Sequence, residues 1–103
     1  MRMLMKVHIP VEAGNAAARG KSLDSKVGKI LEMMKPEAAY FTEDEGMRTG
    51  IIVFDMKDAS QLPSFAEPWF LAFNAKLSVR PAMTVQDLVA GAPGIEAAVK
   101  NFG

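Results

Sequence analysis

The order in which the hydrophobic periodicity changes along this chain constrains the fold more than any other feature. Apolar side chains alternate with a period of two over residues 3–9, which predicts a half-buried strand that ends at Pro10. A period of 3.6 residues follows and predicts a helix that Pro36 ends. Its apolar stripe consists of Leu23, Val27, Ile30, Leu31 and Met34.

The rest of the chain continues this succession of strands and helices. Residues 37–43 and 48–56 are expected to form a hairpin in which Gly46 supplies a positive φ. Residues 58–73 are expected to be helical, with a break or kink near Glu67 because Pro68 follows it. Residues 75–80 alternate again and predict a fourth strand. Thr84 and Asp87 then form a capping box for a last helical segment, which Gly91, Pro93 and Gly94 divide into two short pieces.

The resulting order, β-α-β-β-α-β-α, predicts one α+β domain over residues 1–103. It is the ferredoxin-like βαββαβ arrangement with an extra C-terminal helix. In this topology the sheet is antiparallel, its strand order is four-one-three-two, and both main helices cover the same face.

The opposite face of this sheet poses a problem for a single copy of the chain. The third strand carries four consecutive apolar residues, Ile51 to Phe54, so both of its faces are hydrophobic. A sheet with one solvated face normally shows polar residues there, and monomers seldom expose a large apolar patch. We therefore expect a homodimer of C2 symmetry in which the two sheets face each other.

By its element order, the chain resembles the dimeric α+β barrel superfamily, whose ferredoxin-like subunits pair their sheets into a barrel. Relatives include antibiotic-biosynthesis-type monooxygenases, muconolactone-isomerase-like proteins and stress-responsive barrel proteins. The stretch "PEAAYFTEDEGMRTGIIVFDM" also resembles small uncharacterised bacterial proteins of this type. Haem-degrading members combine a helical tryptophan and a helical histidine with an asparagine on the first strand. This chain has Trp69 but neither of the other two, which counts against a haem role.

Composition excludes several classes of function. The chain has 12 basic and 12 acidic residues, and this zero net charge argues against nucleic acid or a membrane surface as a partner. There is no cysteine, so disulfides and thiolate chemistry are excluded. With a single histidine, no His-rich metal site is expected, and no cofactor is expected either. No signal peptide or membrane-spanning segment is evident, so a cytoplasmic protein is expected.

The stretch "GNAAARGKS", from Gly14 to Ser22, is similar to a phosphate-binding loop. That loop requires four residues between its glycines, whereas five separate Gly14 from Gly20. It also requires a parallel sheet, and an antiparallel one is expected here. We interpret residues 13–20 as a loop or an irregular first turn. A weak anion site at the following helix N-terminus, near Lys21, stays open.

The candidate site residues come from the first and fourth strands. His8 and Lys6 alternate with the apolar set of the first strand, and Lys76 and Arg80 belong to the polar set of the fourth. Neighbouring antiparallel strands place these sets side by side, where they would attract an anionic small molecule. His8 is the candidate acid or base. The alternative is that these residues are only paired across the dimer with Glu37, Glu43 or Asp55.

Three further residues join the candidate site. Tyr40 is a possible hydrogen-bond donor, Arg48 is expected near the His8 end as a charge partner, and Trp69 is a possible wall. Residues like Tyr40 and Trp69 are, however, more often core residues than part of a pocket. Two functions follow. One is a homodimer that binds, and in an enzyme would transform, a small, partly apolar or anionic molecule. The alternative is a non-catalytic interaction protein whose dimerisation fills the barrel.

Overall fold

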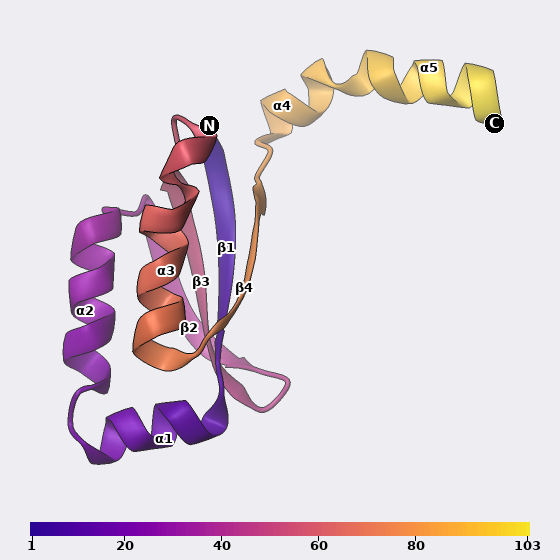
Figure 1. Cartoon of the computed structure of the whole chain (residues 1–103). Coiled ribbons are helices and arrows are strands. Elements are labelled where there is room, and N and C mark those ends of the chain that lie inside the picture. Colours follow the sequence, from indigo (N-terminus) through magenta and orange to yellow (C-terminus); the bar gives the residue numbers. More distant parts are fainter.

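A four-stranded antiparallel sheet forms the centre of the molecule, with helices packed on one of its faces (Figure 1). The structure is a computed structural model and describes residues 1–103. The strands are β1 (Arg2–Ile9), β2 (Ala38–Asp44), β3 (Met47–Asp55) and β4 (Lys76–Pro81), in the order β2-β3-β1-β4. The predicted strands and their spatial order are confirmed, with boundaries that differ by one residue.

Two helices lie between β1 and β2 where one was expected. Helix α1 (Val11–Arg19) precedes α2 (Leu23–Met34), so the interpretation of residues 13–20 as a loop or an irregular turn is wrong. Pro10 stands at the N-cap, and its carbonyl accepts the first helical hydrogen bond from Gly14. Alanines, which favour helices most, fill the second half of α1. The stretch that is similar to a phosphate loop, Gly14 to Ser22, therefore consists of α1 from its middle onward and the short connection to α2.

The core lies between the sheet and the helices. On β1 the alternate residues Met3, Met5, Val7 and Ile9 are buried, as the two-residue period predicts. They pack with buried residues of β3, α2 and α3 into one cluster. Its other members include Ile30, Met34, Ile52, Phe54, Trp69 and Phe73.

Helix α3 (Leu62–Phe73) follows a 3-10 turn, η1 (Ala59–Gln61), and contains Pro68 without a break. Of the predicted break or kink near Glu67, the break is therefore wrong. An interior proline costs about 3 kcal/mol because it removes one helical hydrogen bond and crowds the preceding turn. Burial of Ala66, Trp69 and Phe73 on the sheet side opposes that cost. Pro63 occupies the first turn, as expected.

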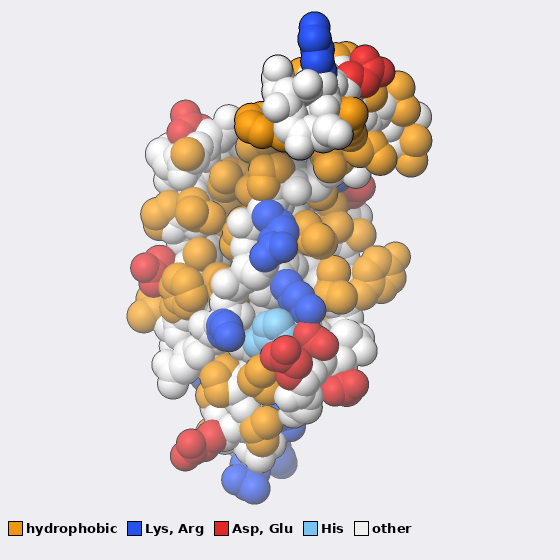
Figure 2. Space-filling model, turned by 90° about the vertical axis from the view of Figure 1, so that its right-hand side faces the viewer, with side chains coloured by type: hydrophobic (Ala, Val, Ile, Leu, Met, Phe, Trp, Pro, Cys, Tyr) orange, Lys and Arg blue, Asp and Glu red, His pale blue; other side chains and the backbone are white.

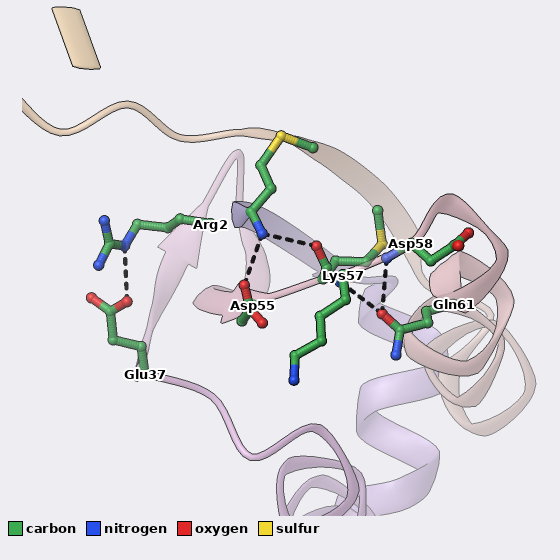
Figure 3. A network of polar contacts seen from close by, with 8 residues as sticks. Arg2, Glu37, Asp55, Lys57, Asp58 and Gln61 are labelled. Carbon is green, nitrogen blue, oxygen red and sulfur yellow. Dashed lines mark hydrogen bonds and ion pairs between the residues drawn. The ribbon is translucent and has the colours of Figure 1, made fainter.

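The two ends of β3 are held in different ways. At one end, Glu45 and Gly46 both adopt a positive φ, which closes the β2–β3 hairpin as predicted for Gly46. At the other end, the N-terminal ammonium donates to Asp55 at 2.8 Å, and Arg2 donates to Glu37 at 2.8 Å (Figure 3). These contacts fix the start of β1 against the start of β2 and the end of β3.

The C-terminal segment stands apart from this body. Helices α4 (Val85–Ala90) and α5 (Ala92–Phe102) leave the end of β4 and project on the side of the sheet that carries no helices (Figure 1). The capping box of Thr84 and Asp87 is present, and α4 ends at Gly91, as predicted. The projecting segment gives the chain a radius of gyration of 16.9 Å, against about 13 Å for a compact chain of this length.

Candidate functional site

The face of the sheet opposite the helices, here called the open face, carries the predicted polar residues (Figure 2). The register pairs His8 with Lys76 and Leu4 with Arg80, and places Lys6 opposite Ser78. Residues that face each other in an antiparallel pair share one side of the sheet. The structure thus brings Lys6, His8, Lys76 and Arg80 together on one face, as the alternation predicted.

His8 and Lys6 share a carboxylate that sequence reasoning missed. The Asp44 Oδ2 atom lies 2.7 Å from Lys6 Nζ and 3.0 Å from His8 Nε2. Asp44 ends β2, two strands away from β1, and the β2–β3 hairpin bends over the open face at that point (Figure 1). The bend depends on the twist of the hairpin, so no sequence spacing would have paired Asp44 with His8.

This pairing changes the charge of the site. The hydrogen bond from Lys6 is the main cause that lowers the pKa of Asp44, and the one with His8 adds to it. Asp44 therefore stays ionised and neutralises part of the positive charge of the open face. The three acidic residues considered as partners across a dimer have contacts within the chain. Glu37 accepts from Arg2, Asp55 from the N-terminus, and Glu43 from the Gly46 amide.

Two cations of the open face are unpaired, one at each end of the β1–β4 pair. Lys76, opposite His8, and Arg80, opposite Leu4, have no carboxylate within 4.0 Å. A shallow hollow of about 280 Å³ is lined by Leu4, Lys6, Ser78 and Arg80. It is open to solvent on this face, so a single copy of the chain does not enclose a ligand there.

Tyr40 and Trp69 do not reach this cluster. Tyr40 lies on the open face opposite Ile51, is 71% exposed, and makes no side-chain hydrogen bond. Trp69 is fully buried on the helix side, tilted against Phe73 with ring centroids 6.1 Å apart. Its indole Nε1 has no acceptor. The core interpretation of Trp69 therefore fits its position, and Tyr40 is not a core residue.

Arg48 lies near the His8 end of the sheet, as expected, but on the other face. Its partner on β1 is Ile9, one of the buried residues, so Arg48 points toward the helices. There it lines a cavity of about 410 Å³ between α2 and strands β2 and β3. The cavity residues are Ile9, Leu23, Asp24, Val27, Gly28, Phe41, Thr42, Arg48 and Thr49.

The position of Arg48 depends on Gly14. Arg48 Nη1 donates to Asn15 Oδ1 at 3.1 Å, and its side chain lies flat against α1. A Cβ atom at position 14 would lie 2.6 Å from Nη1. No carboxylate lies within 4.0 Å of the guanidinium. Gly14, the first glycine of the stretch that is similar to a phosphate loop, thus makes room for the Arg48 side chain and does not form a phosphate loop.

Other kinds of site are not found. No group of three or more histidine, aspartate or glutamate side chains is placed to hold a metal ion. None of the helices has the length and apolar character needed to cross a membrane.

The fold and its open face define the class of this protein as a ferredoxin-like α+β domain with a four-stranded antiparallel sheet. Residues 1–95 match a family described as "Domain of unknown function (DUF3303)", and the chain belongs to that family. No curated protein matches the sequence.

Two solved structures are among those similar to this chain. A formyltetrahydrofolate deformylase from Pseudomonas putida KT2440 matches with a TM-score of 0.50 and 11% identity. The match covers 80% of this chain and 29% of that enzyme, so this chain corresponds to less than a third of it. The de novo designed protein Ferredog-Diesel matches with a TM-score of 0.46 and 8% identity, over 79% of this chain and 85% of the design. At this identity the first likeness shows the fold alone.

Proposed function

We propose that this protein is a homodimer that binds a small monocarboxylate with an apolar body in the cavity beside Arg48. The observation that carries the proposal is a guanidinium with no carboxylate partner at the wall of a largely apolar cavity. Ligand sites of small molecules typically combine apolar walls with a few polar groups that fix orientation.

The chemistry of the cavity favours a carboxylate over other ligands. Arg48 is partly buried, and only one hydrogen bond, to Asn15, holds its side chain. A guanidinium has five N–H donors in a planar fork that matches a carboxylate in a two-point contact. Ile9, Leu23, Val27 and Phe41 would surround the apolar body. Asp24 is exposed at the first turn of α2, so a second negative charge on the ligand would be repelled there.

The cavity favours binding over catalysis. His8, the one histidine, lies on the opposite face of the sheet, and Asp44 already occupies its Nε2 atom. Asp24 is the only carboxylate in the cavity lining, and it is exposed to solvent at the first turn of α2. A solvated carboxylate there is a poor general base, because efficient proton transfer needs a pKa near the working pH. The proposed function is therefore carriage or sensing of the carboxylate without a bound cofactor.

The homodimer rests on the open face. Tyr40, Ile51, Val53 and Leu4 place an apolar strip on that face beside the cations of β1 and β4. Two such faces would bury their strips at the usual spacing of packed sheets, about 10 Å. The second candidate function, a non-catalytic interaction protein, is favoured by the same strip, since dimerisation alone would fill the space between the sheets.

Binding of phenylacetate and hexanoate, measured by calorimetry and thermal shift, tests the proposal. Both acids should raise the melting temperature, whereas phenylacetamide and hexanamide, which lack the charge, should raise it much less. Arg48→Gln should reduce the affinity for both acids by roughly tenfold or more, because a hydrogen bond to a charged group contributes about 1.5–3 kcal/mol.

The matched control is Arg80→Gln, which removes an arginine from the open face and leaves the cavity intact. It should bind both acids as the unaltered protein does. An equal loss of affinity in the two variants, or equal binding of the acids and their amides, would overturn the carboxylate assignment. If the protein is dimeric but binds neither acid, the second candidate function, a non-catalytic interaction protein, would be favoured.

A further inference from the structure

The C-terminal segment, residues 83–102, presents an unpartnered apolar surface and is here called the arm. Most of its large hydrophobic side chains are more than half exposed, and Phe102 is 92% exposed. On α5, Ile95, Val99 and Phe102 follow each other at intervals of four and three residues and form one stripe. The exposed hydrophobic residues of the arm are Met83, Val85, Leu88, Val89, Ile95, Val99 and Phe102.

An apolar groove that could receive the α5 stripe runs along the β4 edge of the sheet. Strand β4 is an edge strand, and the groove of about 310 Å³ runs between it and α3. Five of its seven lining residues are hydrophobic, and the one charged residue is Glu67. The lining consists of Leu62, Pro63, Ala66, Glu67, Phe70, Leu77 and Val79. An exposed strand edge with such a flank is a surface that proteins usually cover.

The arm and the groove of the same chain lie on opposite sides of the sheet. The groove belongs to the helix layer, while α4 and α5 project on the open-face side (Figure 1). From Val85 to Phe102 the arm reaches about 27 Å at the helical rise of 1.5 Å per residue. Facing sheets are about 10 Å apart, and a helix layer adds about 10 Å more. The arm is thus long enough to pass a facing sheet and reach the helix layer behind it.

We propose that the arm clamps a second copy of this chain, with the α5 stripe held in the groove between α3 and β4 of that copy. The inference rests on the homodimer of the proposed function and is independent of the carboxylate. Few charges would meet at this contact. Helix α5 carries one basic residue, Lys100, and one acidic residue, Glu96, and Glu67 is the only charged residue of the groove. Lys100 is thus the residue of the helix that can pair with Glu67. Reciprocal exchange by C2 symmetry would cover both arms and the β4 edges of both copies at once.

The absence of cysteine makes a direct test possible. Two single variants of the full chain, Phe70→Cys in the groove and Val99→Cys in the arm, are mixed and oxidised mildly. A disulfide requires Cα atoms within about 7 Å, so it reports close approach. The mixture should give a covalent dimer of one chain of each kind, identified by mass. The matched control is Leu71→Cys, which is exposed on the same helix but lies outside the groove, and it should cross-link to Val99→Cys far less.

A double variant, Phe70→Cys with Val99→Cys, distinguishes exchange from folding back. Exchange gives a covalent dimer on non-reducing gels, whereas an arm that folds onto its own body gives an internally closed monomer, which would overturn the proposal. Equal cross-linking at positions 70 and 71 would overturn it as well.

Sedimentation separates this inference from the homodimer itself. Val99→Glu should raise the dimer dissociation constant at least tenfold, and Asn101→Glu, on the same helix outside the stripe, should not. If the unaltered protein is dimeric, Val99→Glu does not weaken the dimer and no cross-link to the groove forms, the clamp is rejected and the homodimer is retained. If the unaltered protein is monomeric at micromolar concentration, both proposals are rejected.

Discussion

The guanidinium of Arg48 lies against the backbone of α1 at Gly14, and a Cβ at that position would approach its Nη1 atom to 2.6 Å. Gly14 of α1 and Arg48 of β3 are thus in contact although they lie 34 positions apart in the sequence. This contact explains why a glycine is found in the middle of α1, where it favours the helix by about 1 kcal/mol less than alanine.

Gly14→Ala should separate binding from stability. The clash falls on the far end of a flexible side chain, so Arg48 should swing away and lose its bond to Asn15. Alanine favours the helix, so the free energy of unfolding should change by less than about 1 kcal/mol. Affinity for phenylacetate should nevertheless fall roughly tenfold, because the cation is displaced. Urea unfolding and calorimetry measure the two effects, and an unchanged affinity would dissociate Gly14 from the cavity.

The Asp44 contacts predict a dependence of stability on acid. Hydrogen bonds from Lys6 and His8 hold the folded-state pKa of Asp44 below its ordinary value of 3.8. A depressed pKa stabilises the folded chain above the unfolded value, and that stabilisation is lost as the pH falls through the folded value. The unaltered protein should therefore lose stability below about pH 4 more steeply than Asp44→Asn does.

Thermal unfolding at intervals from pH 6 to pH 2.5 would measure this difference. Asp24→Asn, which removes an exposed carboxylate outside the open-face cluster, is the matched control and should follow the unaltered protein. Parallel curves for Asp44→Asn and the unaltered protein would contradict the predicted linkage.

The strands were predictable because the two-residue period is a local property of the sequence, and their order in the sheet followed from the ferredoxin-like succession of strands and helices. Met3, Met5, Val7 and Ile9 specify the buried face of β1, and with it the side on which Lys6 and His8 lie. The faces on which the β3 side chains lie could not be predicted, because this strand is apolar on both faces and shows no alternation of polar and apolar residues. The sequence therefore predicts the end of the sheet at which Arg48 lies but not its face.

Two features needed information that no local pattern carries. Asp44 meets His8 only because the hairpin bends over the sheet, which is a property of tertiary twist. The continuity of α3 through Pro68 depends on Trp69 and Phe73, whose burial opposes the local cost. The low helix propensity of proline correctly predicts an energetic cost at Pro68, but the packing of Trp69 and Phe73 keeps the helix continuous.

Trp69 provides a test of the core. It is fully buried, and its Nε1 atom has no acceptor. Replacing it by alanine should cost about 3–5 kcal/mol, as for large aromatic residues in cores. Trp69→Phe also leaves a smaller side chain but removes the unsatisfied donor, whose burial costs about 1–3 kcal/mol. It should therefore cost about 1 kcal/mol or less, measured by urea unfolding followed by circular dichroism.

Phe73→Leu is the control for this pair of variants, because it reduces a buried ring without affecting any polar atom. It should cost clearly more than Trp69→Phe. The opposite order would mean that the indole N–H has a partner, such as an internal water molecule, in solution.

Replacing Pro68 should stabilise the protein. In α3 this proline cannot donate to the carbonyl of Ser64, four residues earlier, and its ring crowds that turn. Pro68→Ala restores the donor, which should outweigh the 0.4–1 kcal/mol or so lost because alanine makes the unfolded chain more flexible. We expect a net gain of about 1–2 kcal/mol, seen as a higher midpoint of urea unfolding. Pro63→Ala, in the first turn where no bond is missing, should give no gain. A lower midpoint for Pro68→Ala would show that the ring packs in a way that the helix requires.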